Sequence, residues 1–281
     1  MDLNPHEHAP AVDGDIAPPA DFYYASLYLT PPARYAARVL EAVRRAITDI
    51  PAACTDTGVA HLKLAWWQSE LQQIETGMPR HPLVQALMPL AISEPHLIGV
   101  FERMVATTVA GLHAAPLMSR VAVLQWVNAQ HRELLEHYLC FGVAAHPPQR
   151  GALLEIGALL ELAYALRGLR QHRRGGPLLL AGDRLSAAGL SVDAVRGAQR
   201  SSEIEPVLGG EIDWLRDELL SRCVALPRSL RRAQRLITTL AVCTVEALAL
   251  TRADGCQVLE HRVELLPLRK LWLAWRVRRF G

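Results

Sequence analysis

Apolar residues recur at helical spacing along nearly the whole chain, and this pattern predicts an all-α protein. In residues 153–166 a set of apolar side chains keeps to one side of a helix: Leu153, Ile156, Leu159, Leu160, Ala163 and Leu166. Arginines follow, and Gly175-Gly176-Pro177 then ends the helix. No convincing strand alternation or internal repeat is found. We therefore expect one helical domain over residues 21–281, after a flexible, proline-containing tail over residues 1–20.

Capping and breaking residues place the other helices. Thr30 before Pro31 is a good helix start, and Pro51 is expected to break that helix. Further helices are predicted over residues 59–76, 93–111, 116–142, 212–223 and 226–252. The last contains the longest apolar run, residues 236–250, which polar residues interrupt and which is too short to span a bilayer. It is therefore predicted to be a core helix.

Composition narrows the class of protein. The 281 residues are 51% hydrophobic and 21% charged, which is enough apolar material for a sizeable core. The net charge of +2 creates no strong field, and no recognised module accompanies the arginines, so no nucleic-acid partner is expected. The five cysteines lack C-x-x-C pairing, and the N-terminal segment lacks the apolar stretch of a signal peptide. These features predict a cytoplasmic protein with reduced, buried thiols.

Two groups of histidines are candidate metal sites. His6 and His8 form an H-x-H pair in the tail. The second group lies in the predicted helix over residues 116–142 and contains His131, Glu133, Glu136 and His137. Neither group has an evident third convergent ligand, which a metal site needs. A solvated tail and a solvated helix face are the better interpretations, and no metal site is predicted.

The order of several motifs resembles the squalene/phytoene synthase family. The matching segments are Asp21-Phe22-Tyr23-Tyr24-Ala25-Ser26, KLAWW at residues 63–67, GMPRHPLVQAL at residues 77–87, LRGLRQHRRGGPLLL at residues 166–180, LSAAGLS at residues 185–191 and RKLWLAW at residues 269–275. The resemblance covers roughly residues 21–281. It implies a terpenoid-synthase-like helical bundle around a deep, mostly apolar central cavity.

The resemblance also implies where the family's chemistry is lost. Active members hold a prenyl diphosphate through Mg²⁺ and two aspartate-rich clusters. In the first cluster only Arg45 and Asp49 match, and Thr48 and Ala52 stand at the aspartates that would face the cavity. In the second, the acidic positions and the polar position one turn earlier become Gly168, Gln171, His172 and Tyr164. Mg²⁺ prefers carboxylate oxygens, and no other segment offers compensating acids, so no metal ligand set is expected.

Some ligand contacts remain as candidates. Arg45 and Arg167 are kept from the family's motifs and are the candidate substrate-binding cations, together with Phe22 and Tyr23 of the opening motif. Asp49 is the remnant of the catalytic acids. Asp21 replaces a serine of the diphosphate-binding entry, where a carboxylate would repel the ligand. A cavity tyrosine of the relatives aligns loosely with Gln125 or Trp126.

Two functions are compatible with these features. The leading prediction is a non-catalytic isoprenoid- or lipid-binding protein, or an assembly protein, that needs no cofactor. The family includes such a branch, a mitochondrial complex I assembly factor, whose second motif also lacks acids and is followed by basic residues. The alternative is an active head-to-head prenyl diphosphate transferase that uses Mg²⁺ with the remnants Arg45 and Arg167.

Two basic segments suggest partners. Residues 265–280 interleave aromatic and basic side chains, which suits a membrane interface, although docking on the helical domain explains them equally well. A stripe at helical spacing is expected to be a solvated face: Arg228, Arg231, Arg232 and Arg235. The expected partners are therefore an isoprenoid or lipid ligand, the surface of the inner membrane and a protein.

Overall fold

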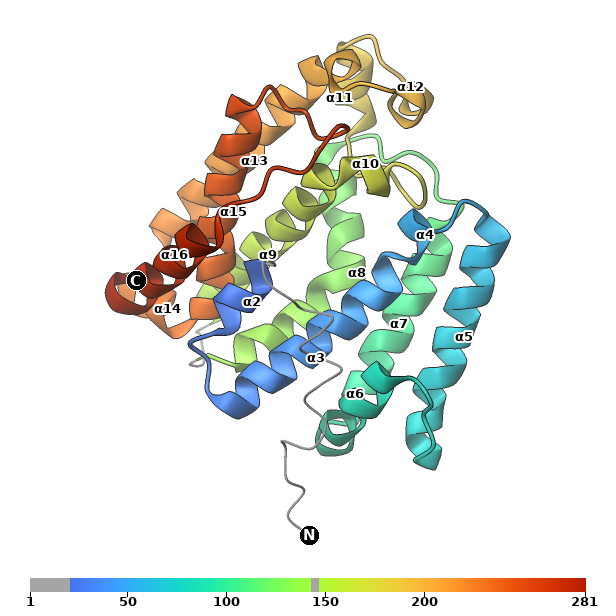
Figure 1. Cartoon of the computed structure of the whole chain (residues 1–281), viewed down its shortest axis with the longest axis vertical. Helices are drawn as coiled ribbons and strands as arrows, with labels where there is room; N and C mark the ends of the chain where they lie inside the picture. Colours follow the sequence, from blue (N-terminus) through green and yellow to red (C-terminus); the bar gives the residue numbers. More distant parts are fainter. Residues whose placement is uncertain (1–20, 143–146) are drawn as a thin grey trace.

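The computed structural model describes residues 21–142 and 147–281. Helices dominate this part of the chain and no strand occurs in it, which confirms the predicted all-α fold (Figure 1). The predicted tail over residues 1–20, with His6 and His8, lies outside the described residues.

The helices are labelled in chain order. They are α2 (Asp21–Ser26), α3 (Pro31–Thr48), α4 (Ile50–Ala53), α5 (Thr57–Thr76), α6 (Pro82–Ser93), α7 (His96–Gly111), α8 (Arg120–Cys140), α9 (Pro147–Arg167), α10 (Leu169–His172), α11 (Gly182–Ala187), α12 (Val192–Gly197), the 3-10 turn η1 (Ser201–Glu203), α13 (Glu205–Ala225), α14 (Arg228–Ala233), α15 (Arg235–Ala253) and α16 (Pro267–Phe280).

Helix ends follow local capping chemistry. Asp56 accepts a first-turn amide at the start of α5, and Gly77 ends that helix with φ 72°, as its sequence predicts. Ser119 accepts a first-turn amide of α8, so this helix begins at Arg120 and not near residue 116. The helix expected from residue 93 also begins later, at α7, because the Ser93 hydroxyl bonds within α6 and does not cap α7.

The first motif helix breaks close to Pro51, as predicted. α3 ends at Thr48, Asp49 is its C-cap, and α4 begins at Ile50. The glycine turn after α10 packs directly on this break, because a Cβ at Gly175 would overlap the Pro51 carbonyl group. The two segments that carry the family's motifs therefore lie side by side, at the upper end of the molecule in Figure 1.

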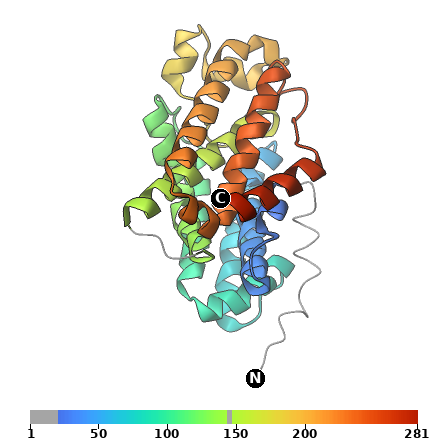
Figure 2. The same cartoon turned by 90° about the vertical axis from the view of Figure 1, so that its left-hand side faces the viewer.

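Helix α9, the predicted organising helix, lies in the middle of the bundle. It packs against α8, α13 and α15, and the two views of the molecule show it enclosed by them (Figures 1 and 2). The main apolar cluster includes residues from Phe22 to Leu259, so helices from α2 to α15 share it. Burying one large apolar side chain such as Phe101 contributes about 1.5–3 kcal/mol.

Helix α15 is the described helix that is long and apolar enough to cross a membrane by length and composition. More than half of its apolar window is buried, and it packs against α13, α9, α16 and α2. These contacts support the prediction of a core helix.

The predicted helix over residues 226–252 and its arginine stripe are corrected by the structure. The chain breaks at Gln234 between α14 and α15, so the four arginines do not share one helix face. Arg231 donates to backbone carbonyls at the end of α13, including that of Leu226 at 3.0 Å, and Arg235 donates to the Tyr28 carbonyl at 2.9 Å. These two arginines tie segments together and are not a solvated face.

All five cysteines are free thiols. Cys223, Cys243 and Cys256 are buried, as expected, whereas Cys54 is half-buried and Cys140 is exposed. Burial raises the pKa of Cys243 to about 12, so this thiol stays protonated and unreactive at neutral pH.

Candidate ligand-binding cavity

A cavity of about 290 Å³ lies between α2, α3, α8, α9 and α15 and is closed by the segment that leads into α16. Its walls are largely apolar and include Phe22, Leu135, Leu160, Ile237 and Leu240. Gly157 of α9 also lines it, where a Cβ would press on the Leu135 side chain. The wall is therefore built from the apolar stripes that the sequence pattern predicts.

A buried ion network forms one polar part of the cavity. The Arg44 guanidinium donates to both carboxylate oxygens of Glu41, at 2.7 and 2.8 Å, and to Glu161 at 2.9 Å. Arg45 donates to Glu41 at 2.6 Å, and the Tyr138 hydroxyl donates to the same carboxylate at 3.1 Å. Tyr138 belongs to α8 and Glu161 to α9, so the network fixes α3 against both helices.

The pKa values of the network follow from burial and charge. Burial acts to raise the pKa of Glu41, but the adjacent Arg44 and Arg45 outweigh it and lower the pKa to about 2. Burial raises the pKa of Glu161, against the opposing effect of Arg44. Burial and the Glu41 charge raise the pKa of Tyr138 well above its usual value, so its hydroxyl remains a donor.

A second ion cluster closes the cavity beside α2 and α16. Arg167 pairs with Asp21 at 3.2 Å and with Glu264 at 3.4 Å, and it donates to the Val263 carbonyl at 2.9 Å. Lys270, which is fully buried, contacts Asp21 at 2.7 Å and Glu264 at 2.8 Å. Asp21, expected to repel a diphosphate at the entry, instead joins α2 to α9 and α16.

The charged groups that line the cavity balance one another. They are the carboxylates of Asp21, Glu41, Glu161 and Glu264 and the guanidiniums of Arg44, Arg45, Arg167 and Arg262. Arg262 also pairs with Glu264 at 2.8 Å, and its guanidinium lies 4.8 Å from the ring centre of Tyr164. The lining therefore carries no excess charge of either sign.

The positions of the lost metal ligands meet elsewhere. Thr48 and Ala52 line a separate small cavity of about 70 Å³ together with His172. The two motif segments thus converge as the resemblance implies, but without facing carboxylates. Gly168 is the buried N-cap of α10, and Gln171 is exposed.

These residues do not fit Mg²⁺. The candidate donors at the convergence are a hydroxyl, an imidazole and the nearby carboxylate of Asp49, whose charge acts on His172. Mg²⁺ requires near-octahedral oxygen ligands, supplied in such sites by several carboxylates and phosphates. The convergence of the two motif segments therefore does not offer the ligand set of a Mg²⁺ site.

The structure places the other predicted site residues as follows. Arg45, Arg167 and Phe22 line the central cavity, with Phe22 packed on Tyr138 at a ring distance of 5.4 Å. Tyr23 is not among the lining residues, and the Arg38 guanidinium lies over its ring at 4.5 Å.

The remaining candidates lie at the motif convergence. Asp49 is half-buried at the end of α3. Of the two loosely aligned positions, Trp126 lines the small cavity.

Comparison with known proteins identifies the scaffold. The sequence model of the family described as squalene/phytoene synthase matches residues 19–269. The chain belongs to the squalene/phytoene synthase family. Among curated proteins, none matches it in sequence.

Solved structures share the fold of this squalene/phytoene synthase family member. A dehydrosqualene synthase in complex with ligand superposes with a TM-score of 0.75 at 13% identity, covering 98% of this chain and 96% of that one. Squalene synthase HpnC from Alicyclobacillus acidocaldarius superposes with a TM-score of 0.62 at 17% identity, covering 90% and 99%. At these identities the likeness establishes the fold, and the site must be judged from its own residues.

Two expectations about acids and histidines are corrected. The sequence suggested no further acids at the site, but Glu41 and Glu161 both line the cavity. A spacing of three and four residues between Glu41 and the arginines of α3 was the available signal for the first. His131, expected on a solvated helix face, is buried, and burial lowers its pKa to about 3, helped by Arg44.

Proposed function

We propose that this member of the squalene/phytoene synthase family is non-catalytic and binds a neutral isoprenoid or lipid chain in its central cavity. The charge balance of the lining carries this proposal. Its arginines are already engaged by carboxylates, so an apolar ligand can enter without disturbing them. No cofactor is required.

The same cavity lining would disfavour a prenyl diphosphate. Its phosphates would have to draw Arg45 from Glu41, or Arg167 from Asp21 and Glu264, and so weaken ion pairs that are buried or partly buried. Loss of such a pair costs free energy, because the charges have already been taken out of water. The metal that would offset the phosphate charge finds no suitable ligand set where the motifs converge. The active-transferase alternative is therefore disfavoured.

The cavity size supports a single ligand. Its volume of about 290 Å³ lies at the lower end of small-molecule pockets, which run from about 300 to 1,000 Å³. Head-to-head condensation needs two prenyl chains at once. One chain bound along the walls formed by α9 and α15 is the better match.

Filling the cavity should abolish ligand binding. Leu240 lines the cavity from α15, and a Leu240→Trp variant is expected to weaken binding of farnesol or geranylgeraniol by more than about tenfold. Leu250→Trp is the matched control, because Leu250 lies on the same helix but is exposed. Tryptophan fluorescence titration measures both. Equal affinities in the two variants would place the ligand outside this cavity.

We further propose that α16 holds the protein at an anionic membrane surface. One side of this helix docks on the domain through Leu273, Ala274 and Val277. Its exposed side chains include a group of apolar residues: Leu266, Leu268, Leu271, Trp272, Trp275 and Phe280. Both interpretations of residues 265–280 therefore have support, each on a different side of the helix.

Basic residues accompany this exposed apolar group. Arg269 and Arg276 lie over the Trp272 ring, at 4.4 and 4.8 Å, and Arg278 and Arg279 are exposed near the end of α16. Exposed aromatic and basic side chains on one helix suit the lipid headgroup region. Residues 262–264, which border the cavity, lead directly into α16, so a lipid chain would have a short path from membrane to cavity.

Vesicle binding tests the membrane proposal. A Trp272→Ala/Trp275→Ala variant is expected to bind phosphatidylglycerol vesicles more than about tenfold less tightly than the unmodified protein, because two aromatic anchors are lost. Trp66→Ala is the control, since Trp66 is similarly exposed on α5. Co-sedimentation measures all three proteins. An undiminished affinity in the double variant would contradict the assignment of α16.

A further inference from the structure

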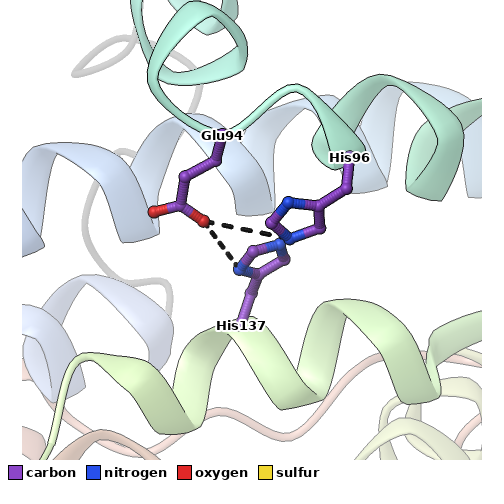
Figure 3. Close-up of side chains that lie close together, drawn as sticks. All are labelled: Glu94, His96 and His137. Atoms are coloured by element: carbon purple, nitrogen blue, oxygen red, sulfur yellow. Dashed lines mark ion pairs between the residues drawn. The ribbon is translucent and has the colours of Figure 1, made fainter.

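A group of side chains that could bind a metal joins the α6–α7 junction to α8, outside the two segments that correspond to the family's aspartate-rich clusters. Glu94 and His96 flank Pro95 at the junction, and His137 lies on α8 (Figure 3). A Glu94 carboxylate oxygen lies 3.5 Å from His137 Nδ1 and 3.9 Å from His96 Nε2. Within the part of the chain that the structure describes, only these three residues are grouped closely enough to hold an ion, with ligand atoms all within 4.8 Å of one another.

An adjoining cavity and an unpaired nitrogen mark the same place. A cavity of about 170 Å³ opens beside the group and is lined by both histidines. The His137 side chain is only 11% exposed; its Nδ1 faces the Glu94 carboxylate, and its Nε2 is buried without a hydrogen-bond partner. No hydrogen bond at Nε2 therefore holds the ring away from an ion that is bound through Nδ1.

We propose that Glu94, His96 and His137 form a binding site for one zinc-class divalent ion, with a coordination position left open to water. Two imidazoles and one carboxylate are a donor set that zinc uses with an open fourth position. Imidazole favours zinc and its neighbours in the transition series over Mg²⁺. The site thus differs in both place and preferred metal from the family's Mg²⁺ clusters.

The geometry requires the His96 ring to rotate. With metal–ligand distances of about 2.0–2.2 Å, tetrahedral ligands lie roughly 3.4 Å apart, close to the 3.5 Å between Glu94 and His137. The two imidazole rings are now stacked, with centres 4.6 Å apart, and must tilt so that the ion lies in the plane of each. His96 is 62% exposed at the start of α7 and is free to make this rotation.

Neighbouring acids are already engaged. Glu133 is hydrogen-bonded to Arg103, and Glu136 pairs with Arg132 and Arg150. They are therefore not counted among the ligands. Of the group that sequence spacing singled out, only His137 takes part, and the other two ligands come from the α6–α7 junction, some forty residues earlier in the chain.

A second histidine pair supplies an internal control. His61 is half-buried and His113 exposed, and they approach to 3.2 Å between their Nε2 atoms, yet they belong to no group of three metal-binding side chains among the described residues. A chance pair of histidines near the surface is expected, like this pair, to contribute no zinc site. The His6-x-His8 pair of the N-terminal segment provides a second control pair.

Calorimetric titration of the full-length, untagged protein with Zn²⁺ tests the proposal. We expect one site per chain whose affinity falls more than about tenfold in His96→Ala and in Glu94→Gln, two exposed positions where folding should be unaffected. His61→Ala and the His6→Ala/His8→Ala variant should retain the site. Co²⁺ substitution should give a tetrahedral absorption spectrum that is lost in His96→Ala.

Three results would overturn the proposal. They are the absence of a stoichiometric site, unchanged Zn²⁺ affinity in both His96→Ala and Glu94→Gln, and loss of the site in the His6→Ala/His8→Ala variant alone. Circular dichroism melting of each variant without metal verifies that it is folded. None of these readouts depends on prenyl-diphosphate chemistry, so the metal site and the proposed function are tested separately.

Discussion

Replacing Arg44 with methionine is expected to lower the free energy of unfolding by about 3–5 kcal/mol, a large share of the stability of a domain of this size. Arg44 is 3% exposed and contacts both Glu41 and Glu161. Methionine keeps much of the volume but leaves two buried carboxylates with fewer counter-charges. Urea denaturation followed by circular dichroism measures the change.

The control is an exposed ion pair. Arg103 and Glu133 also form a two-point contact, but their side chains are 57% and 51% exposed. Arg103→Met should therefore cost less than about 1 kcal/mol. If Arg44→Met cost no more than Arg103→Met, the buried network would not organise the cavity as described.

Stability is expected to fall with acidification from about pH 6.5, earlier than carboxylate protonation alone would cause. The cause is His131, which faces Arg44 and Glu41 and whose pKa is lowered to about 3, chiefly by burial. The unfolded chain takes up this proton near the usual pKa of 6.5, whereas the folded chain does not. Its contribution to stability is complete above pH 6.5 and is lost progressively down to about pH 3.

A His131→Gln variant isolates this effect. Between pH 6.5 and 4.5 it should lose about 2–3 kcal/mol less stability than the unmodified protein, because two pH units below the unfolded pKa correspond to that amount. His137 and His172, whose pKa values burial also lowers, titrate in the same range and remain in both proteins. Parallel stability profiles for the two proteins would rule out the role assigned to His131. The loss of stability that protonation of Glu41 causes is expected below pH 4.5.

Much of the fold is predictable from local sequence. The Gly77 C-cap, the helix break near Pro51 and the stop after α10 act over a few residues, and the apolar stripe of α9 predicts a central helix. Local signals failed where a tertiary contact decided the structure. At Gln234, which donates to the Leu139 carbonyl at 3.1 Å, the predicted long helix breaks in two.

The sequence predicts the missing metal ligands of the site better than it predicts the buried ion pairs. The motif alignment predicts that Thr48, Ala52 and His172 converge without facing carboxylates, and they line one cavity. The pairing of Arg44 with Glu161 spans 117 positions, and that of Lys270 with Asp21 joins the two ends of the domain. No periodicity encodes such partners, because they depend on how the helices pack.

These pairings contribute to the packing of the bundle. Buried ion pairs hold α2, α3, α9 and α16 together. Such pairs fix geometry at little net gain in stability. The likeness to assembly factors in the second motif remains a prediction.

The most direct test of the central claim is the Mg²⁺ dependence of binding. Farnesol and farnesyl diphosphate are titrated calorimetrically with and without Mg²⁺, and released diphosphate is assayed in the same samples. A neutral-ligand cavity predicts that farnesol binds at least as tightly as its diphosphate, that Mg²⁺ changes neither affinity by more than about tenfold, and that no diphosphate is released. Mg²⁺-dependent tightening for the diphosphate alone, with release of diphosphate that Asp49→Ala abolishes, would contradict the account and establish a synthase.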